Sequence, residues 1–186
     1  MDSLLAQVLA FRPNRLVPPF DLQGHIPFVA WLVKELQPAT FVQLGTQSGN
    51  LYFAACQTVA ENSLPTRCWA VGTWQAEELA QRHSVQQEAG ASDYNRQHFG
   101  AFSGLLRMGD AQALPRFAPG SIDLLLIDGR YSPETVRNEY ESWRDRLSDH
   151  AVVLLVGIEQ ADSGAAALWL QLQPQYPHLA FAHAQG

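Results

Sequence analysis

Short apolar runs alternate with amphipathic segments along most of this chain. Helical periodicity, with apolar residues recurring every three or four positions, predicts helices at 25–36, 50–61, 132–147 and 164–176. Short runs rich in apolar residues predict strands at 40–45, 67–72, 105–109, 121–128, 151–158 and 179–184. The polar stretch from 75 to 104 fits either a loop or a helix. Strands and helices therefore alternate along the chain.

The predicted strands are apolar throughout rather than at every second position, as in SIDLLLID at 121–128. Such strands are buried on both faces, which predicts an α/β fold with a mostly parallel, doubly wound sheet covered by helices on both sides. Ser132 and Pro133 are typical of the N-cap and first position of a helix. Residues 1–20, interrupted by prolines, are expected to form an N-terminal arm, and residues 21–186 a single domain.

Composition narrows the class of protein. The chain has 186 residues, of which 47% are hydrophobic and 16% charged, with a net charge of -6. This balance indicates a globular domain, and no apolar run is long enough to span a membrane. The acidic balance argues against nucleic acid as a partner. Cys56 and Cys68 lie in apolar segments without metal-ligand spacing, and no secretory leader is recognised, so we expect free thiols and a cytoplasmic location.

In a doubly wound sheet, ligands bind where the strands end, at their carboxyl edge. The strand at 40–45 runs into the glycine loop, residues 45–49 with the sequence GTQSG, in which the glycines allow the backbone to approach a ligand closely. This spacing is neither that of the dinucleotide-binding loop nor that of the phosphate-binding P-loop. A tight strand-to-helix turn without a ligand remains the alternative.

Three stretches carry a resemblance to a known family: WLVKELQPATFVQLGTQSGNLYFAACQTV, PTRCWAVGTW and APGSIDLLLIDGRYSPETVRNEYESWRDRLSDHAVVLLV. In the order and spacing of their motifs, residues 25–183 resemble a class I S-adenosylmethionine-dependent methyltransferase. More narrowly, they resemble the small methyltransferase-like domains found in bacterial chains alongside glycosyltransferases. The resemblance implies a Rossmann-like sheet, S-adenosyl-L-methionine as cofactor, and methyl transfer to a sugar or other small acceptor. Because that class ends with an antiparallel hairpin, the fold is expected to lack its last strand.

The resemblance also implies which residues form the site. Asp128, which follows an apolar run at a strand end, would face the transferred methyl group, with Tyr131 as an orienting group. Trp74 would lie against the adenine, and Asp110 would accept a hydrogen bond from its amino group unless it serves only as an N-cap. The full set of cofactor-binding positions is Gly45, Thr46, Gln47, Ser48, Gly49, Gly72, Thr73, Trp74, Asp110 and Asp128.

Several positions depart from the family's pattern. Gln43 replaces a glutamate at the end of the first strand, and Gly72 replaces the acid that would hold the ribose hydroxyls. Tyr131 stands where a histidine is common, and Val156 and Gly157 replace a His-Asp pair after the fifth strand. The remaining acids are too few for Mg²⁺, so no bound metal is expected.

Two classes of function fit these departures. The first is a metal-independent O-methyltransferase in glycan biosynthesis, in which Asp128 takes the proton from the acceptor hydroxyl and alignment supplies the rest. The second is a catalytically degenerate methyltransferase fold, a pseudoenzyme that serves as a binding or assembly module, for example with a glycosyltransferase partner or domain. A nicotinamide-dependent enzyme is disfavoured by the loop spacing and by the absent ribose acid.

Overall fold

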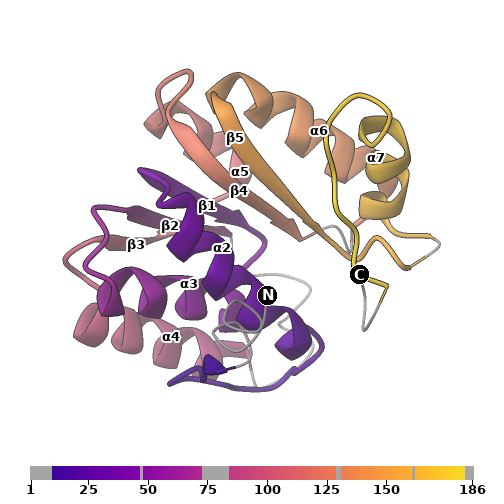
Figure 1. The fold of residues 1–186 in the computed structure, drawn as a ribbon. Coiled ribbons are helices and arrows are strands. Elements are labelled where there is room, and N and C mark those ends of the chain that lie inside the picture. The colour runs from indigo at the N-terminus through magenta and orange to yellow at the C-terminus, as the bar shows by residue number, and fades with distance from the viewer. Residues whose placement is uncertain (1–9, 47, 73–83, 129–130, 161, 183–186) are drawn as a thin grey trace.

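The computed structural model describes residues 10–46, 48–72, 84–128, 131–160 and 162–182, with backbone only for 84–89 and 128. Its centre is a five-stranded sheet in the order β3-β2-β1-β4-β5 (Figure 1). All neighbouring strands pair in parallel, and the order reverses between β1 and β4. The strands are β1 (Thr40–Leu44), β2 (Arg67–Gly72), β3 (Ser103–Arg107), β4 (Ile122–Asp128) and β5 (Leu147–Val156). The predicted doubly wound parallel sheet is therefore confirmed.

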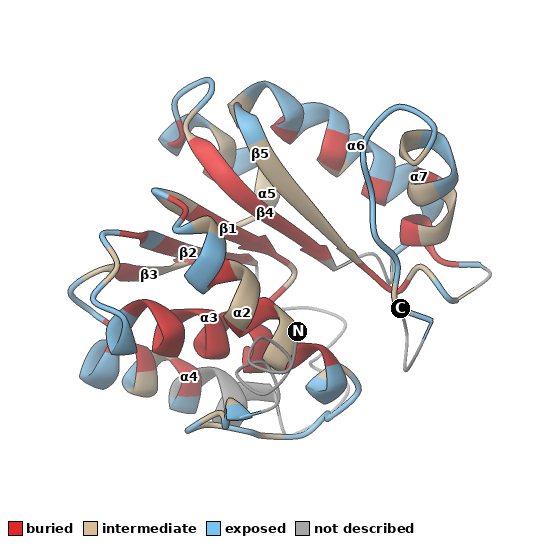
Figure 2. Ribbon diagram, viewed as in Figure 1, coloured by how far each residue is buried: buried red, intermediate tan, exposed pale blue. Residues whose placement is uncertain are grey.

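Helices cover both faces of this sheet (Figure 1), and each face has its own hydrophobic core. One face packs against α2 (Ile26–Leu36), α3 (Asn50–Glu61) and α4 (Ser84–His98). The other packs against α5 (Asp110–Ala113), α6 (Pro133–Trp143) and α7 (Gly164–Leu172). Figure 2 shows β1 and β4 buried between the two layers. The described residues also form short 3-10 helices: η1 (Gln23–His25), directly before α2, η3 (Leu114–Arg116) and η4 (Arg144–Arg146).

Local sequence signals explain several element ends. Ser132 caps α6 by accepting a hydrogen bond from the Thr135 N–H, and Pro133 occupies the first turn, as predicted. Ser163 caps α7 in the same way through the Ala166 N–H.

The buried thiols of Cys56 and Cys68 are both free, as expected.

The structure differs from the sequence prediction at the C-terminal side. β5, predicted to be fully buried, is mostly half-buried because it lies at the edge of the described sheet. A strand was also expected at 179–184, but residues 179–182 are not in a strand. Instead the Phe181 ring packs edge-on against Phe28 of α2, with ring centroids 4.6 Å apart. Phe181 therefore contacts a helix face rather than a neighbouring strand, whereas Leu179 is largely exposed.

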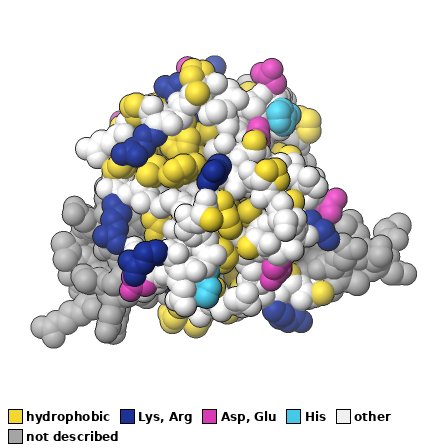
Figure 3. Space-filling model, turned by 90° about the vertical axis from the view of Figure 1, so that its left-hand side faces the viewer, with side chains coloured by type: hydrophobic (Ala, Val, Ile, Leu, Met, Phe, Trp, Pro, Cys, Tyr) yellow, Lys and Arg dark blue, Asp and Glu magenta, His cyan; other side chains and the backbone are white. Residues whose placement is uncertain are grey.

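The surface carries mixed charge. Figure 3 shows the side of the molecule that lies at the left of Figure 1, where basic, acidic and hydrophobic side chains are interspersed. Among the residues coloured there, neither sign of charge forms a continuous patch. In the described part of the chain, no helix is long and apolar enough to cross a membrane.

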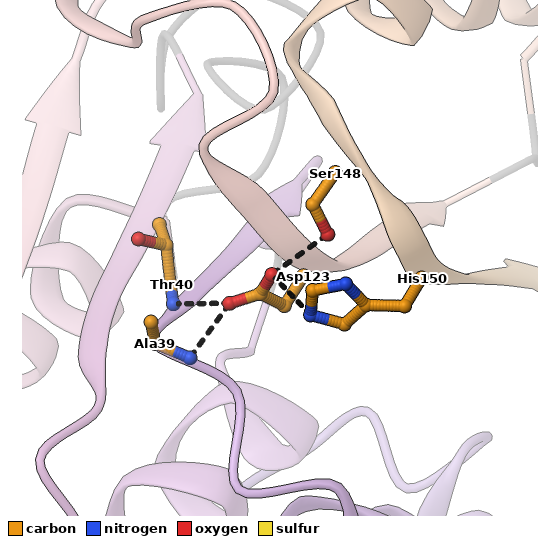
Figure 4. Close-up of polar contacts among 5 residues, drawn as sticks. All are labelled: Ala39, Thr40, Asp123, Ser148 and His150. Carbon is orange, nitrogen blue, oxygen red and sulfur yellow. Dashed lines mark hydrogen bonds and ion pairs between the residues drawn. The ribbon is translucent and has the colours of Figure 1, made fainter.

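Asp123 joins the amino ends of three strands, at the edge of the sheet opposite the strand ends discussed below (Figure 4). Its carboxylate accepts hydrogen bonds from the backbone N–H of Ala39 at 2.7 Å and of Thr40 at 3.3 Å. It also accepts one from the Ser148 hydroxyl at 2.7 Å and lies 3.2 Å from His150 Nε2. The register of β4 on β5 shifts at this residue. These contacts fix the relative positions of β1, β4 and β5.

The Asp123 contacts predict a loss of stability in acid. Burial alone would raise the pKa of Asp123, but the hydrogen bonds from Ser148, Ala39 and Thr40, with His150 nearby, outweigh it and lower the pKa. A carboxyl with a lowered folded-state pKa stabilises the fold above its unfolded pKa of about 4, and this contribution is lost as pH falls through the folded pKa. In urea unfolding at pH 7 and at about pH 3, we expect Asp123→Asn to lose less stability on acidification than the wild type. Equal losses of stability in the two proteins would contradict this role of the Asp123 carboxylate.

Candidate functional site

The strand register brings the carboxyl ends of β1, β2, β4 and β5 to one edge of the sheet. Leu44 pairs with Val71 of β2 and with Ile127 of β4. Asp128 then pairs with Val156 of β5. Gly72 closes β2 one residue after Val71, and Gly157 follows Val156. Positions widely separated in sequence, Leu44, Gly72, Asp128 and Gly157, thus meet at the edge where ligands bind in such sheets.

The glycine loop crosses this edge between β1 and α3. Gly45 and Gly49 have φ angles of +72° and +74°, in the left-handed region that favours glycine. The Gly45 N–H donates to the Val71 carbonyl at 3.1 Å, and the Gly49 N–H donates to the Thr46 carbonyl at 2.8 Å. A Cβ at Gly49 would lie 2.8 Å from the Phe53 ring. Both glycines are therefore required by the loop's conformation, and Gln47 lies outside the described residues.

Within the described residues, two buried polar atoms near this loop have no hydrogen-bond partner. The side chains of Gln43 and Thr46 are each 4% exposed, and Gln43 Oε1 and Thr46 Oγ1 accept or donate no hydrogen bond. Leaving such an atom unpaired costs about 1–3 kcal/mol, so these positions are unfavourable in the protein alone. In the sequence, Gln43 stands out only as a lost acid. The structure shows instead a buried acceptor on β1, two residues before the glycine loop.

Asp110 begins α5, and it is not an N-cap, since Gly109 occupies that position. It lies two residues after Met108, which forms an antiparallel bridge with Gly72 at the end of β2. Burial raises the pKa of Asp110, and a side-chain hydrogen bond with Glu139 of α6 partly offsets this. A half-buried carboxyl therefore stands next to the end of β2.

The structure describes the remaining predicted site residues to different extents. Asp128 ends β4, but only its backbone is described, and Thr73 and Trp74 lie outside the described residues. Tyr131 is 40% exposed, and its carbonyl accepts a hydrogen bond from the Gly164 N–H at 2.9 Å. Gly157 has a φ of +96°, so the residue that replaces a family acid there also permits a left-handed backbone.

No metal centre is formed by the residues that the structure describes, because none of their His, Cys, Asp and Glu side chains gather in groups of three or more. The prediction of a metal-free site stays a prediction, since the Asp128 side chain belongs to the undescribed part.

A family profile described as "Methyltransferase domain" matches residues 42–155, from β1 to near the end of β5. The chain belongs to this methyltransferase family. The match covers the glycine loop, Gly72, Asp110 and Asp128, and it confirms the resemblance to methyltransferases found in the sequence.

Known proteins are similar to this chain in sequence or in structure over most of its length. The chain is 35% identical to an uncharacterised protein of Sinorhizobium fredii, y4gI, over all of its own length but only 20% of that relative's length. It superposes on a methyltransferase of Geobacter sulfurreducens with a TM-score of 0.60 and 14% identity, covering 100% of this chain and 92% of that one. It superposes on the O-methyltransferase TomG of Streptomyces achromogenes, solved with S-adenosylmethionine, with a TM-score of 0.55 and 13% identity. That match covers 95% of this chain and 80% of TomG.

These matches confirm the predicted class I methyltransferase fold and agree with the predicted cofactor class. They also show that this methyltransferase domain corresponds to about a fifth of the Sinorhizobium relative.

Proposed function

We propose that this domain binds S-adenosyl-L-methionine at the carboxyl edge of its sheet and transfers the methyl group to a hydroxyl oxygen of a small acceptor. The observation that carries the proposal is the pair of buried, unpartnered atoms Gln43 Oε1 and Thr46 Oγ1 beside the glycine loop of a methyltransferase domain. A bound ligand with polar groups would satisfy both atoms and recover the cost of burying them.

The residues present fit the polar groups of this cofactor. Its ammonium group is a donor, which suits the carbonyl oxygen of Gln43. Its carboxylate suits the N–H groups in the first turn of α3, where the N-cap Gly49 has no capping side chain and the Asn50 N–H makes only a long contact of 3.4 Å with the Ser48 hydroxyl. Asp110 would accept from the adenine amine, since its carboxyl is half-buried next to the end of β2. Gly45, Ser48 and Gly49 would form the floor beneath the ligand, with Gln47, Thr73 and Trp74 completing it.

When bound, the cofactor supplies an activated methyl group on a positively charged sulfur, and the acceptor oxygen replaces that sulfur on the methyl carbon. The chain's part is to align the two reactants and to remove the hydroxyl proton. In this scheme the carboxylate of Asp128, at the end of β4, accepts the hydroxyl proton, and Tyr131 orients the acceptor. No metal ligand is required by this scheme.

A sugar or another small molecule of a glycan pathway is the acceptor we favour, in the cytoplasm, with a glycosyltransferase partner or domain nearby. The resemblance to methyltransferase-like domains that accompany glycosyltransferases supports this choice.

A second function is favoured by one observation. Gly72 and the Val156-Gly157 pair remove acids from two strand ends at the site, and Gly157 is also needed for its positive φ. A domain that keeps the fold but has lost these groups would act as a binding or assembly module in the same pathway.

Calorimetric titration with S-adenosylhomocysteine tests the cofactor site. We expect saturable binding at one site per chain, unchanged by EDTA or by added Mg²⁺. A folded protein that shows no binding heat and no ligand-induced rise in melting temperature would contradict the proposal. Release of S-adenosylhomocysteine from S-adenosylmethionine in a panel of monosaccharides and nucleotide sugars then separates the enzyme from the binding module.

A further inference from the structure

Residues 12–19 of the N-terminal arm lie along α3, and none of them belongs to a helix or strand. Two buried carboxamides on α3, Asn50 and Gln57, hold it. Asn50 Oδ1 accepts from the Val17 N–H at 3.1 Å, and Asn50 Nδ2 donates to the Val17 carbonyl at 2.7 Å and the Pro19 carbonyl at 3.2 Å. Each carboxamide offers a carbonyl acceptor and an N–H donor, as a peptide group would in a neighbouring strand, and its NH₂ group carries a second N–H donor.

Gln57 repeats this arrangement about two helical turns further along the same helix. Its Oε1 accepts from the Asn14 N–H at 2.8 Å, and its Nε2 donates to the Arg12 carbonyl at 3.0 Å. The arm is therefore fixed at two points, one on either side of Arg15. Residues 12–19 cannot shift along α3 without breaking one of these sets of hydrogen bonds.

Arg15 lies between these points and reaches the glycine loop. Its Nη1 donates to the Ser48 carbonyl at 2.7 Å. Its guanidinium lies over the Phe53 ring at 4.8 Å and the Tyr94 ring at 5.7 Å from the ring centroids. In the described part of the chain these are its contacts, and none of them is an ion pair with a carboxylate. Burial lowers the pKa of Arg15, and the Tyr94 hydroxyl opposes this shift.

The contact with Ser48 acts on the loop's conformation. The peptide group between Ser48 and Gly49 is held at both ends, since its carbonyl accepts from Arg15 and its N–H donates to the Thr46 carbonyl at 2.8 Å. Gly49 is the N-cap of α3 and has a positive φ, a conformation that glycine can leave at little cost. A glycine loop therefore gains from an external contact that holds this peptide in place.

We propose that the N-terminal arm clamps the glycine loop in its ligand-binding conformation, with Arg15 as the positioning residue. The arm is then part of the site rather than an appendage to the domain. The consequence for cofactor affinity rests on the proposed function, whereas the effect on the loop itself does not. A pre-positioned loop binds more tightly, because less conformational freedom is lost when the ligand binds.

The experiment compares Arg15→Ala and Arg15→Lys with a matched control, Arg12→Ala. Arg12 is an exposed arginine of the same arm whose Nη1 donates to the adjacent Phe11 carbonyl, and its own backbone carbonyl, which accepts from Gln57, survives the substitution. Amide hydrogen exchange without ligand is measured in the loop segment 45–50 and in the core strand β4. Affinity for S-adenosylhomocysteine is measured by calorimetry below the melting temperature of every variant.

We expect Arg15→Ala to speed exchange in the loop but not in β4, and to weaken S-adenosylhomocysteine binding by about tenfold. Arg15→Lys, which keeps a donor and a charge over the rings, should recover most of both effects, and Arg12→Ala should match the wild type. Loop exchange equal in Arg15→Ala and Arg12→Ala, or faster exchange throughout the protein, overturns the clamp. If Arg15→Ala does not fold, Arg15→Met, which keeps an unbranched apolar stem without a donor or a charge, replaces it under the same criteria. A wild type that binds no S-adenosylhomocysteine refutes the proposed function, and the exchange data still decide on the clamp.

Discussion

Replacing Gln43 with leucine should make the ligand-free protein more stable and its cofactor binding weaker. Gln43 is 4% exposed and its Oε1 has no partner, so the native protein bears the cost of a buried unpaired acceptor, about 1–3 kcal/mol. Leucine has a similar size and removes that cost. The same change removes the acceptor proposed for the cofactor's ammonium group, a charge-assisted bond whose loss weakens binding by roughly ten- to a hundredfold.

Gln43→Leu is informative because it should raise the stability of the ligand-free protein and lower its affinity for the cofactor. Denaturant unfolding without ligand and calorimetry with S-adenosylhomocysteine measure the two effects separately. Thr46→Val is the matched variant, because Thr46 is equally buried and its Oγ1 is also unpartnered. A Gln43→Leu protein that loses stability and keeps its affinity would show that the side chain serves the fold and not the ligand. Functional sites are the places where local rules of burial are expected to be broken in this way.

The sheet could be predicted because its strands are apolar on both faces, a pattern typical of parallel strands buried between two layers of helices. SIDLLLID at 121–128 predicted β4 almost residue by residue, and Ser132 with Pro133 predicted the start of α6. The position of β5 as the outermost strand of the described sheet was harder to predict. β5 has the composition of a buried strand, and hydrophobicity alone does not tell whether a neighbour lies beside it. Phe181 shows the converse, since it lies in a segment predicted to be a strand but packs against Phe28 of α2.

The candidate site could be located from sequence, but its polar contacts could not be predicted. The glycine loop was recognised from its position after β1, because parallel strands end at a common edge. The state of Gln43 and Thr46, buried and unpaired, depends on how α3 and the loop pack and leaves no trace in the local pattern. The arm was predicted, but its contacts with α3 and the glycine loop were not. Two carboxamides on one face of the otherwise apolar α3, Asn50 and Gln57, were the signal that this face binds backbone.

Gly72→Asp should tighten binding of S-adenosylhomocysteine by about ten- to a hundredfold, which corresponds to one charge-assisted hydrogen-bonding partner of about 1.5–3 kcal/mol. Gly72 ends β2 in extended backbone, paired with Arg107 of β3, so an aspartate there requires no left-handed conformation. The new carboxylate would stand where the family keeps the acid that binds the ribose hydroxyls. Calorimetric titration of the variant and the wild type, each with a melting curve, measures the gain and the stability together.

Two controls separate charge from backbone effects in this experiment. Gly72→Asn keeps the shape without the charge, and it should give a smaller gain in affinity, because a neutral acceptor forms the weaker hydrogen bond. Gly157→Asp places a carboxylate at the end of β5 instead, where φ is +96°, so it should lower stability. If Gly72→Asp is well folded and still binds no S-adenosylhomocysteine, other side chains close the pocket. The glycine loop would then be a structural remnant, and the binding-module function would be favoured over methyl transfer.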